Sequence, residues 1–348
     1  MTEAPPRHGR AGLIVPLALF AVALAAWTGW WFYLAREVES RVEARAAAMR
    51  QAGWTAQWSS LNASGWPFRV RLEARDFVAA APSRHAVAAP RMLAEANAYN
   101  PLKWVLIAPD GLTLTRAEKG RVDVSGRALR MSVHGLDQPY PNVAVELVEP
   151  VFTAHAGAEP FPISRAERAE FYLRPHLAPT GADNGDSVDI LLRLVEAEGR
   201  DNGPVQGVAQ NGRLSAQIEA VVNDASRLKG ADAEGVFANW IRAGGRFTRV
   251  RGQLSAGESR ALLSSDSLSA DADGRLVGSI ALRAEKPMQA LAGLARSGSG
   301  AVNRGGAAGA AAATSIAGGE GDVALTLEFR DGRSFLGPFP LAPAPKLF

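Results

Sequence analysis

The sequence predicts an N-terminal transmembrane helix followed by a mainly-β body of antiparallel strands with few short helices. Two observations carry this prediction: the stretch from Ala11 to Ala35 has no charged residue, and most of the later chain alternates apolar with polar residues. The chain has 348 residues, of which 47% are hydrophobic, so it can bury a sizeable core. The alternation leaves open whether the strands form curved sheets or a closed sandwich.

The N-terminal residues are expected to hold the chain in a membrane. At about 1.5 Å per helical residue, residues 11–35 can span a bilayer core of about 30 Å. Arg7 and Arg10 precede this span, and the positive-inside rule then places residues 1–10 in the cytoplasm. For a bacterial chain this predicts an inner-membrane anchor and a periplasmic body. Aromatic residues that favour the membrane interface crowd the far end of the span: Trp27, Trp30, Trp31, Phe32 and Tyr33.

A cleaved signal peptide is the alternative interpretation. Its basic start fits, but the apolar stretch is longer than a usual signal core and ends in bulky rings instead of small residues. An uncleaved anchor is therefore favoured. Residues 36–52 are predicted to continue as a helical stalk, because Val38, Val42 and Met49 recur at helical spacing and Gly53 can end the helix.

The body is expected to divide into two β-rich lobes, residues 53–178 and 187–348, joined by a linker from Pro175 to Ser187. Three Asp-Gly pairs mark candidate hairpin turns, because glycine readily adopts the positive φ that tight turns require. These pairs are Asp110-Gly111, Asp273-Gly274 and Asp331-Gly332. The clearest alternating runs are Leu214 to Val222, Leu276 to Ala284 and Val323 to Phe329.

Two short helices and one irregular tract are expected among the strands. Phe237 and Trp240 recur at helical spacing within residues 236–243, and Pro287 can begin a second helix. Both helices are expected to cover a sheet. The tract from Ser297 to Gly321 is almost wholly Ala, Gly and Ser, and its repeated glycines predict a flexible loop.

The composition argues against several kinds of chemistry. Cysteine is absent, which excludes disulfides, thiolate metal sites and cysteine nucleophiles, and the five histidines are scattered singly, so no metal or cofactor is expected. The 38 lysines and arginines form no dense run, so no nucleic-acid partner is expected. Neither a G-x-S-x-G nor a phosphate-binding G-x-x-x-x-G-K sequence occurs. No catalytic residue is assigned, and an enzyme is not expected.

The most distinctive local string runs from Gly65 to Val70 and reads GWPFRV. Gly65 and Pro67 are predicted to fix the backbone of a turn, as Asp273, Gly274, Asp331 and Gly332 do elsewhere. Trp66 and Phe68 point the same way on an extended chain. One interpretation is a lip that faces the membrane or a ligand. The other, which the sequence favours, is a turn that seals a core beneath the anchor.

The anchor, the helix after it, the Gly65 to Arg69 string and the segment from Asp331 to Pro340 together resemble the bacterial envelope proteins of domain-of-unknown-function family 2125. More remotely, an anchor followed by hairpins with Asp-Gly turns is similar to the AsmA-like envelope proteins, whose curved sheets line apolar grooves associated with lipid traffic. The resemblance implies an envelope protein and supplies no catalytic residues.

The function expected from these features is an apolar-ligand or lipid-binding module that helps to maintain the envelope, with membrane lipids and a bound lipid as partners. The reason is that an open sheet with one apolar face must be covered, and the two short helices are too small to cover it. The alternative is a structural or assembly protein whose body binds other envelope proteins. A second alternative is a hydrolase that uses scattered serine and aspartate residues.

Overall fold

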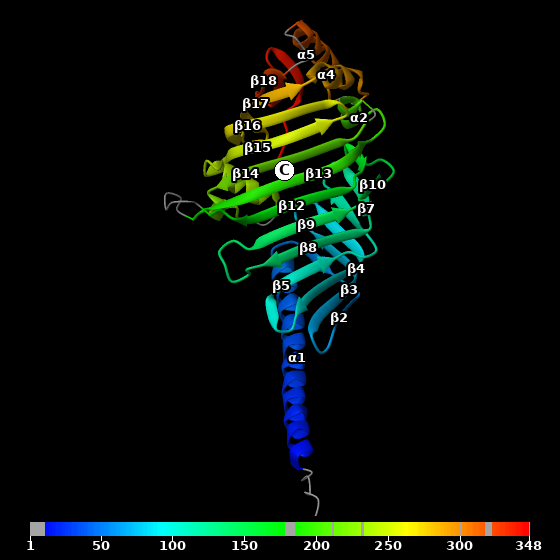
Figure 1. Ribbon diagram of the computed structural model, residues 1–348, viewed down its shortest axis with the longest axis vertical. Coiled ribbons are helices and arrows are strands. Elements are labelled where there is room, and N and C mark those ends of the chain that lie inside the picture. Colours follow the sequence, from blue (N-terminus) through cyan, green and yellow to red (C-terminus); the bar gives the residue numbers. More distant parts are fainter. Residues whose placement is uncertain are drawn as a thin grey trace, which may run out of the picture.

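A long N-terminal helix and one large antiparallel sheet make up the protein (Figure 1). The computed structural model describes residues 11–177, 185–210, 212–230, 233–298, 301–316 and 322–347. Within these residues the strands belong to a single sheet, so the predicted fold class is confirmed in its curved-sheet form.

Helix α1 runs without a break from Ala11 to Gln51, so the predicted anchor and stalk are one helix. It is long and apolar enough to cross a membrane. The side chains of residues 14–26, such as Leu19 and Phe20, are exposed. Gly53 follows the helix end with a φ of +87°, as predicted for a terminating glycine.

The strands of the first half of the body are β1 (Thr55–Gln57), β2 (Ser60–Ser64), β3 (Arg69–Ala80), β4 (Ala86–Asn97), β5 (Asn100–Ile107), β6 (Leu112–Arg116), β7 (Gly120–Ser125), β8 (Ala128–His134), β9 (Asn142–Val148), β10 (Val151–Ala154), β11 (Ile163–Arg165) and β12 (Arg168–Pro175). Those of the second half are β13 (Ser187–Gly199), β14 (Leu214–Asn223), β15 (Phe247–Ala256), β16 (Ser259–Ala270), β17 (Leu276–Glu285), β18 (Asp322–Arg330), β19 (Arg333–Leu336) and β20 (Phe339–Pro343).

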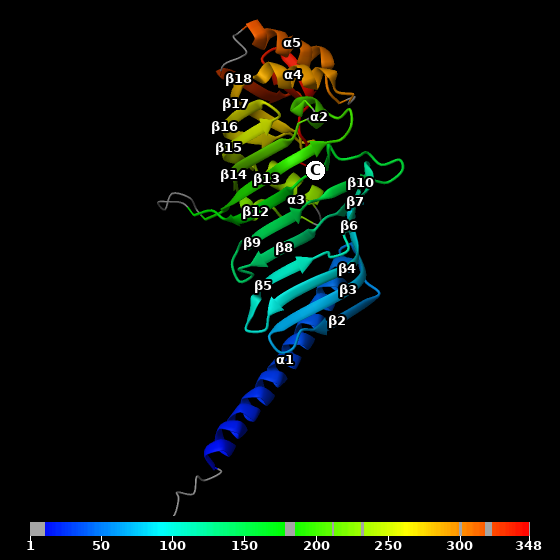
Figure 2. The same ribbon diagram turned by 45° about the vertical axis from the view of Figure 1, so that its right-hand side comes forward.

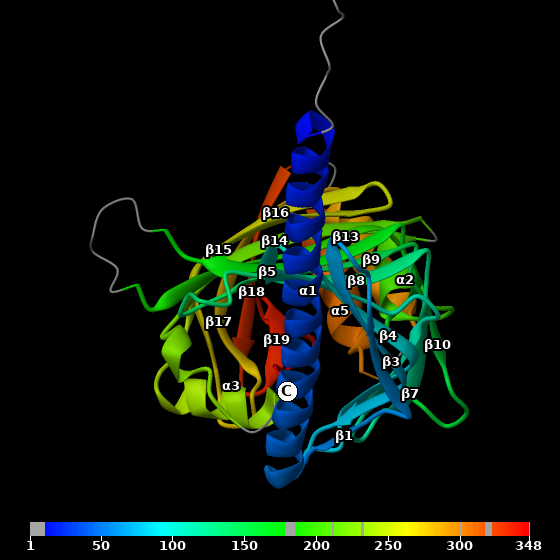
Figure 3. The ribbon, with the colours of Figure 1, turned by 90° about the horizontal axis from the view of Figure 1, so that it is seen from below.

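From β3 onwards the chain crosses the sheet as an antiparallel meander in which each full-length strand pairs with the next, and β1 and β2 both pair with β3. Four successive strands are bent in the middle, and each is labelled as two strands. The pairs of halves are β5 with β6, β7 with β8, β9 with β10, and β11 with β12. The bend between β5 and β6 lies at Gly111 (φ +83°), and that between β9 and β10 at Glu149 (φ +52°). Bulges at Glu196 and Arg249, both with positive φ, bend β13 and β15. The strands therefore form an arch, with α1 and β19 on its inner side (Figure 3).

Two of the three predicted hairpin turns are confirmed. Asp331-Gly332 joins β18 to β19 with positive φ at both residues, and Asp273-Gly274 joins β16 to β17. In the second turn the Asp271 carboxylate accepts hydrogen bonds from the backbone N–H groups of Asp273 and Arg275, at 3.0 and 2.9 Å. The third prediction is wrong, because Asp110-Gly111 lies in the bend between β5 and β6, which do not pair with each other.

The sheet is continuous where the sequence predicts a division into two lobes. Strand β12 pairs with β13 along its whole length, from Arg168 opposite Val195 to Pro175 opposite Val188. Residues 178–184 of the predicted linker lie outside the described residues. The described ladder therefore joins the two predicted lobes into one sheet.

The two predicted short helices are present as α3 (Ala233–Arg242) and α4 (Pro287–Arg296), the second with Pro287 in its first turn. Trp240 of α3 is fully buried, and its indole N–H donates to the Asn223 carbonyl at 2.6 Å. A further helix, α2 (Pro204–Ala209), and a short 3-10 helix, η1 (Ala225–Arg227), are additional to those predicted.

The tract predicted as a flexible loop contains helix α5 (Arg304–Ile316), so that prediction is wrong for residues 304–316. Its small residues are the reason that it packs, because they let two backbones approach closely. Ala307 and Ala310 are buried in a cluster with Leu336 and Leu341. The helix packs against β20, the last strand of the sheet, while α1 contacts β1 and β2 at the opposite edge. Both sheet edges are thus covered by helices, which protects them from pairing with another chain.

Adjacent glycines of α5 provide a test of this packing. An added Cβ at Gly306 would lie 1.8 Å from the Pro340 carbonyl oxygen, whereas at Gly305 the nearest heavy atom would be 3.6 Å away. Gly306→Ala is therefore expected to lower the free energy of unfolding by about 1–3 kcal/mol. Gly305→Ala should leave it unchanged or raise it by up to about 1 kcal/mol, since alanine is the better helix former. Urea denaturation of the full chain in detergent measures both, and equal midpoints would show that α5 is not packed on β20.

Candidate functional site

One face of the sheet is apolar on β3, β4, β5, β8 and β9 and on each strand from β12 to β18, and we call it the apolar face. Its central row consists of residues that stand directly opposite one another on successive strands, and every member is apolar or glycine. The row comprises Leu72, Ala94, Leu106, Met131, Val145, Phe171, Leu192, Ile218, Gly252, Leu263, Leu282 and Leu325.

The rows on either side of the central row have the same character. Because side chains alternate between the faces of a strand, residues two positions away point to the same side. One flanking row comprises Val70, Ala96, Trp104, Val133, Val143, Leu173, Ile190 and Ala220. The other comprises Leu129, Leu147, Ala169, Leu194, Ala216, Leu254, Ala261, Ala284 and Val323.

The opposite face of the sheet is charged. Glu146 and Glu170 stand directly opposite each other, and arginines on both sides and between them compensate their charges. Arg168 lies 3.6 Å from Glu146 and 3.3 Å from Glu170, and Arg193 lies 3.5 Å from Glu170. The strands therefore separate apolar from charged side chains across the sheet, and the apolar face is the one turned towards the helices.

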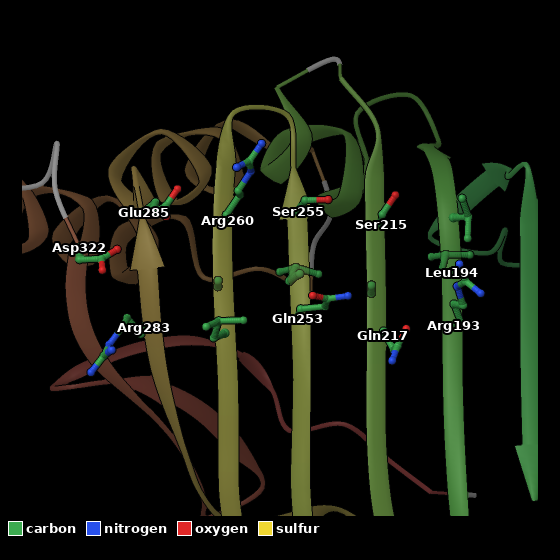
Figure 4. A pocket seen from close by; sticks show the side chains of 15 residues that line it. Arg193, Leu194, Ser215, Gln217, Gln253, Ser255, Arg260, Arg283, Glu285 and Asp322 are labelled. Carbon is green, nitrogen blue, oxygen red and sulfur yellow. The ribbon is translucent and has the colours of Figure 1, made fainter.

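A hollow of about 510 Å³ lies on the charged face over β13 to β18 (Figure 4). Its polar lining mixes cations such as Arg193 and Arg283 with anions such as Glu285 and Asp322. The balance of charges favours neither an anion nor a cation. Among the described residues no three His, Asp or Glu side chains group closely enough to hold a metal ion.

Helices cover the apolar face at three places (Figure 2), and the C-terminal segment covers it at a fourth, where Ala344 packs with Ala220 and Val250. At the near end Trp31 and Leu34 of α1 pack on Val70 and Ala98. At one side Trp240 of α3 packs with Val188 and Val222, next to Leu173 and Ile190. At the far end α4 and α5 cover the row around Leu282, Leu325 and Leu327.

The uncovered middle lies on β9, β12, β13 and β14. Leu192 is 48% exposed and Ile218 is 36% exposed, although both belong to the central row. Together with Val145, Leu147 and Phe171 they line a hollow of about 290 Å³. This site is a shallow apolar trough that offers contact area and few polar groups to orient a ligand.

Three tryptophans fasten α1 to the body. The indole N–H groups of Trp27, Trp30 and Trp31 donate to the carbonyls of Pro67, Ala98 and Arg69, at 2.8, 3.3 and 2.6 Å. These three backbone carbonyls would otherwise need water as a hydrogen-bond donor, and the indoles of the helix take its place. The helix is therefore fixed to the β2–β3 and β4–β5 turns at the near end of the apolar face.

The predicted turn at Gly65 is present in an unusual form. Gly65 has a φ of +102°, where an added Cβ would lie 2.8 Å from the Arg69 carbonyl, and the Trp66-Pro67 peptide bond is cis. Trp66 and Phe68 are 49% and 66% exposed. These two rings therefore do not seal a core, and the backbone of the turn, which receives the Trp27 and Trp31 indoles, makes the contact with the anchor.

One polar cluster, beside the place where Trp240 packs on the apolar face, is tightly hydrogen-bonded. The Asp186 carboxylate accepts hydrogen bonds from the Tyr140 hydroxyl at 2.5 Å and from the backbone N–H and side chain of Ser226 at 2.6 and 2.7 Å. Burial, with the hydrogen bond to Asp186, raises the pKa of Tyr140 to about 12. Tyr140 therefore stays a hydrogen-bond donor at neutral pH and ties the loop before β9 to η1.

The sequence alone did not single out Leu192 and Ile218 as a site. Alternation placed Ile218 on the inner face of a strand, as it did for the apolar residues on either side of it. Whether such a residue is covered depends on where α1, α3, α4 and α5 end, which alternation does not reveal. The site thus rests on the exposure of two residues within an otherwise covered face.

A comparison with protein-family models matches residues 31–345 to DUF2125, described as an uncharacterized protein conserved in bacteria. The chain belongs to this family. The match begins at Trp31, so the DUF2125 region includes Trp31 and Leu34, which pack on the body. No curated protein and no solved structure matches the chain, and the more remote AsmA-like resemblance stays a prediction.

Proposed function

We propose that this DUF2125 protein binds lipid acyl chains on the uncovered middle of its apolar face and helps to maintain the bacterial envelope. The observation that supports this is the run from Met131 to Ile218, which is apolar on five neighbouring strands and carries exposed aliphatic side chains at Leu192 and Ile218. Binding, and no catalysis, is assigned to this site.

The dimensions of the run suit an acyl chain. Five strands about 4.8 Å apart give a run of about 19 Å, compared with about 15 Å for one half of a bilayer core of about 30 Å. Removing apolar surface from water contributes roughly 25 cal/mol per Å², so a chain laid along the run would be held by burial alone. A trough with so few polar groups would recognise chain length and shape more than headgroup chemistry.

The anchor supports a membrane source for this ligand. We propose that α1 stays uncleaved in the inner membrane, with the N-terminus in the cytoplasm and the body in the periplasm. Removal of the first 35 residues would delete Trp31 and Leu34 from the cluster on Val70 and Ala98. Arg7 and Arg10 give the orientation through the positive-inside rule.

Photo-crosslinking in native membranes tests the proposal. A benzophenone amino acid in place of Leu192 lies on the apolar face, and the matched control in place of Leu262 is an exposed leucine of the charged face. We expect an adduct of phospholipid mass at position 192 and none at position 262. The absence of a lipid adduct at position 192, or an adduct to a protein alone, would contradict lipid binding and support the assembly-protein alternative.

A further inference from the structure

Four exposed side chains surround α1 at the end of the body from which the free part of the helix emerges. We call them the rim, and their exposed fractions lie between 48% and 69%: Trp66, Phe68, Tyr99 and Leu102. They belong to the β2–β3 and β4–β5 connections and the start of β5, at the lower end of the body in Figure 1. None of them belongs to a hydrophobic cluster of the body.

Hydrogen bonds fix the height of the rim along α1. Trp66 donates its indole N–H to the Thr28 hydroxyl at 3.3 Å. The carbonyl of the neighbouring Pro67 accepts from Trp27 at 2.8 Å. The two connections are also joined to each other, because the Ala98 N–H donates to the Phe68 carbonyl at 2.8 Å. The rim therefore sits at the level of residues 27–30 of the helix.

The part of α1 between Ala11 and this level is shorter than a bilayer core is thick. The rim therefore cannot lie wholly outside the membrane if the helix spans it. From Ala11 to Trp27 the helix advances 16 residues (27 minus 11), or about 24 Å at 1.5 Å per residue. A bilayer core is about 30 Å thick, and the uncharged stretch continues to Ala35 before the first charge at Arg36. A tilted helix would bring the rim deeper still.

We infer that the rim is inserted in the membrane, at the boundary between headgroups and acyl chains of the leaflet on the body's side. Tryptophan and tyrosine are the residues that favour this boundary. A cation follows each apolar part of the rim, Arg69 after Phe68 and Lys103 after Leu102; both side chains are exposed, and Arg69 also lies 3.4 Å from the Glu95 carboxylate. Their charges lie where lipid phosphates would be, since long basic side chains reach from the boundary to the headgroups.

Insertion of the rim would set the sheet upright on the bilayer. The near end of the apolar face, at Val70 and Trp104 beside α1, would then stand directly over the lipid surface. This inference concerns the position of the body and holds whether or not the apolar face carries a ligand.

Spin labels on single cysteines can measure the depth of the rim, because the chain has no cysteine of its own. The full chain is reconstituted in phosphatidylglycerol and phosphatidylcholine vesicles with a label at Phe68→Cys or Leu102→Cys. The matched controls are Leu19→Cys, exposed in the middle of the apolar half of α1, and Leu262→Cys, exposed on the charged face. The accessibility of each label to oxygen, which concentrates in lipid, is compared with that to a water-soluble nickel chelate.

We expect the ratio of oxygen to nickel accessibility at positions 68 and 102 to exceed that at position 262 several-fold, and to approach that at position 19. All four positions are exposed, so the substitutions should leave the unfolding midpoint unchanged. A ratio at positions 68 and 102 equal to that at position 262 would overturn the inference. A water-like ratio at position 19 would overturn it as well, because α1 would then not span the bilayer.

Discussion

Trp31→Ala is expected to lower the free energy of unfolding of the full chain by about 3–5 kcal/mol, the usual cost of truncating a buried large aromatic residue. Trp31 is 5% exposed and packs with Leu34, Val70 and Ala98. Its indole also donates to the Arg69 carbonyl at 2.6 Å, in the β3 strand that begins the apolar face. The substitution leaves both a cavity and a carbonyl without its donor.

Urea denaturation in detergent micelles, followed by the circular dichroism of the β-sheet, measures this effect. Phe32→Ala is the matched control, because Phe32 is the next aromatic residue of α1 and its side chain is exposed. The control should change the free energy of unfolding by no more than about 0.5 kcal/mol. Equal midpoints for the two variants would mean that α1 is not docked on the body and that a cleaved leader is compatible with folding.

Alternation in the sequence was sufficient to predict the fold class and the faces of individual strands. In the run from Leu214 to Val222, for example, it separated inward Ala216 and Ile218 from outward Gln217 and Glu219, which the strand registers confirm. It did not predict the curvature of the sheet, because the bulges at Glu196 and Arg249 require positive φ at residues of ordinary type. The local sequence at these positions does not differ visibly from that of a straight strand.

Helix α5 was missed for a different reason. Its glycines lower the intrinsic tendency to form a helix, and propensity alone therefore predicted a loop. The same glycines permit contact with β20 at Gly306, and contact between distant parts of the chain outweighs local propensity. A similar limit applied to Trp66 and Phe68, whose exposure depends on where the turn stands relative to α1.

The apolar face leads to the second large expected effect. Leu192→Asp combined with Ile218→Asp places two carboxylates in the middle of the central row, where they would have to lose water for an acyl chain to bind. We expect lipid occupancy to fall at least about tenfold, which corresponds to about 1.4 kcal/mol of binding free energy. The folded state should be affected much less, because both side chains are already partly exposed. Leu262→Asp introduces the same charge on the opposite face and should not change the occupancy.

The most direct test of lipid binding is native mass spectrometry of the full chain extracted in mild detergent, which weighs the protein together with any lipid that stays bound. The proposal predicts about one phospholipid per chain for the unmodified protein and for Leu262→Asp, and at most about one tenth of that for Leu192→Asp with Ile218→Asp. An unmodified chain free of lipid, or equal lipid occupancy in all three proteins, would contradict it.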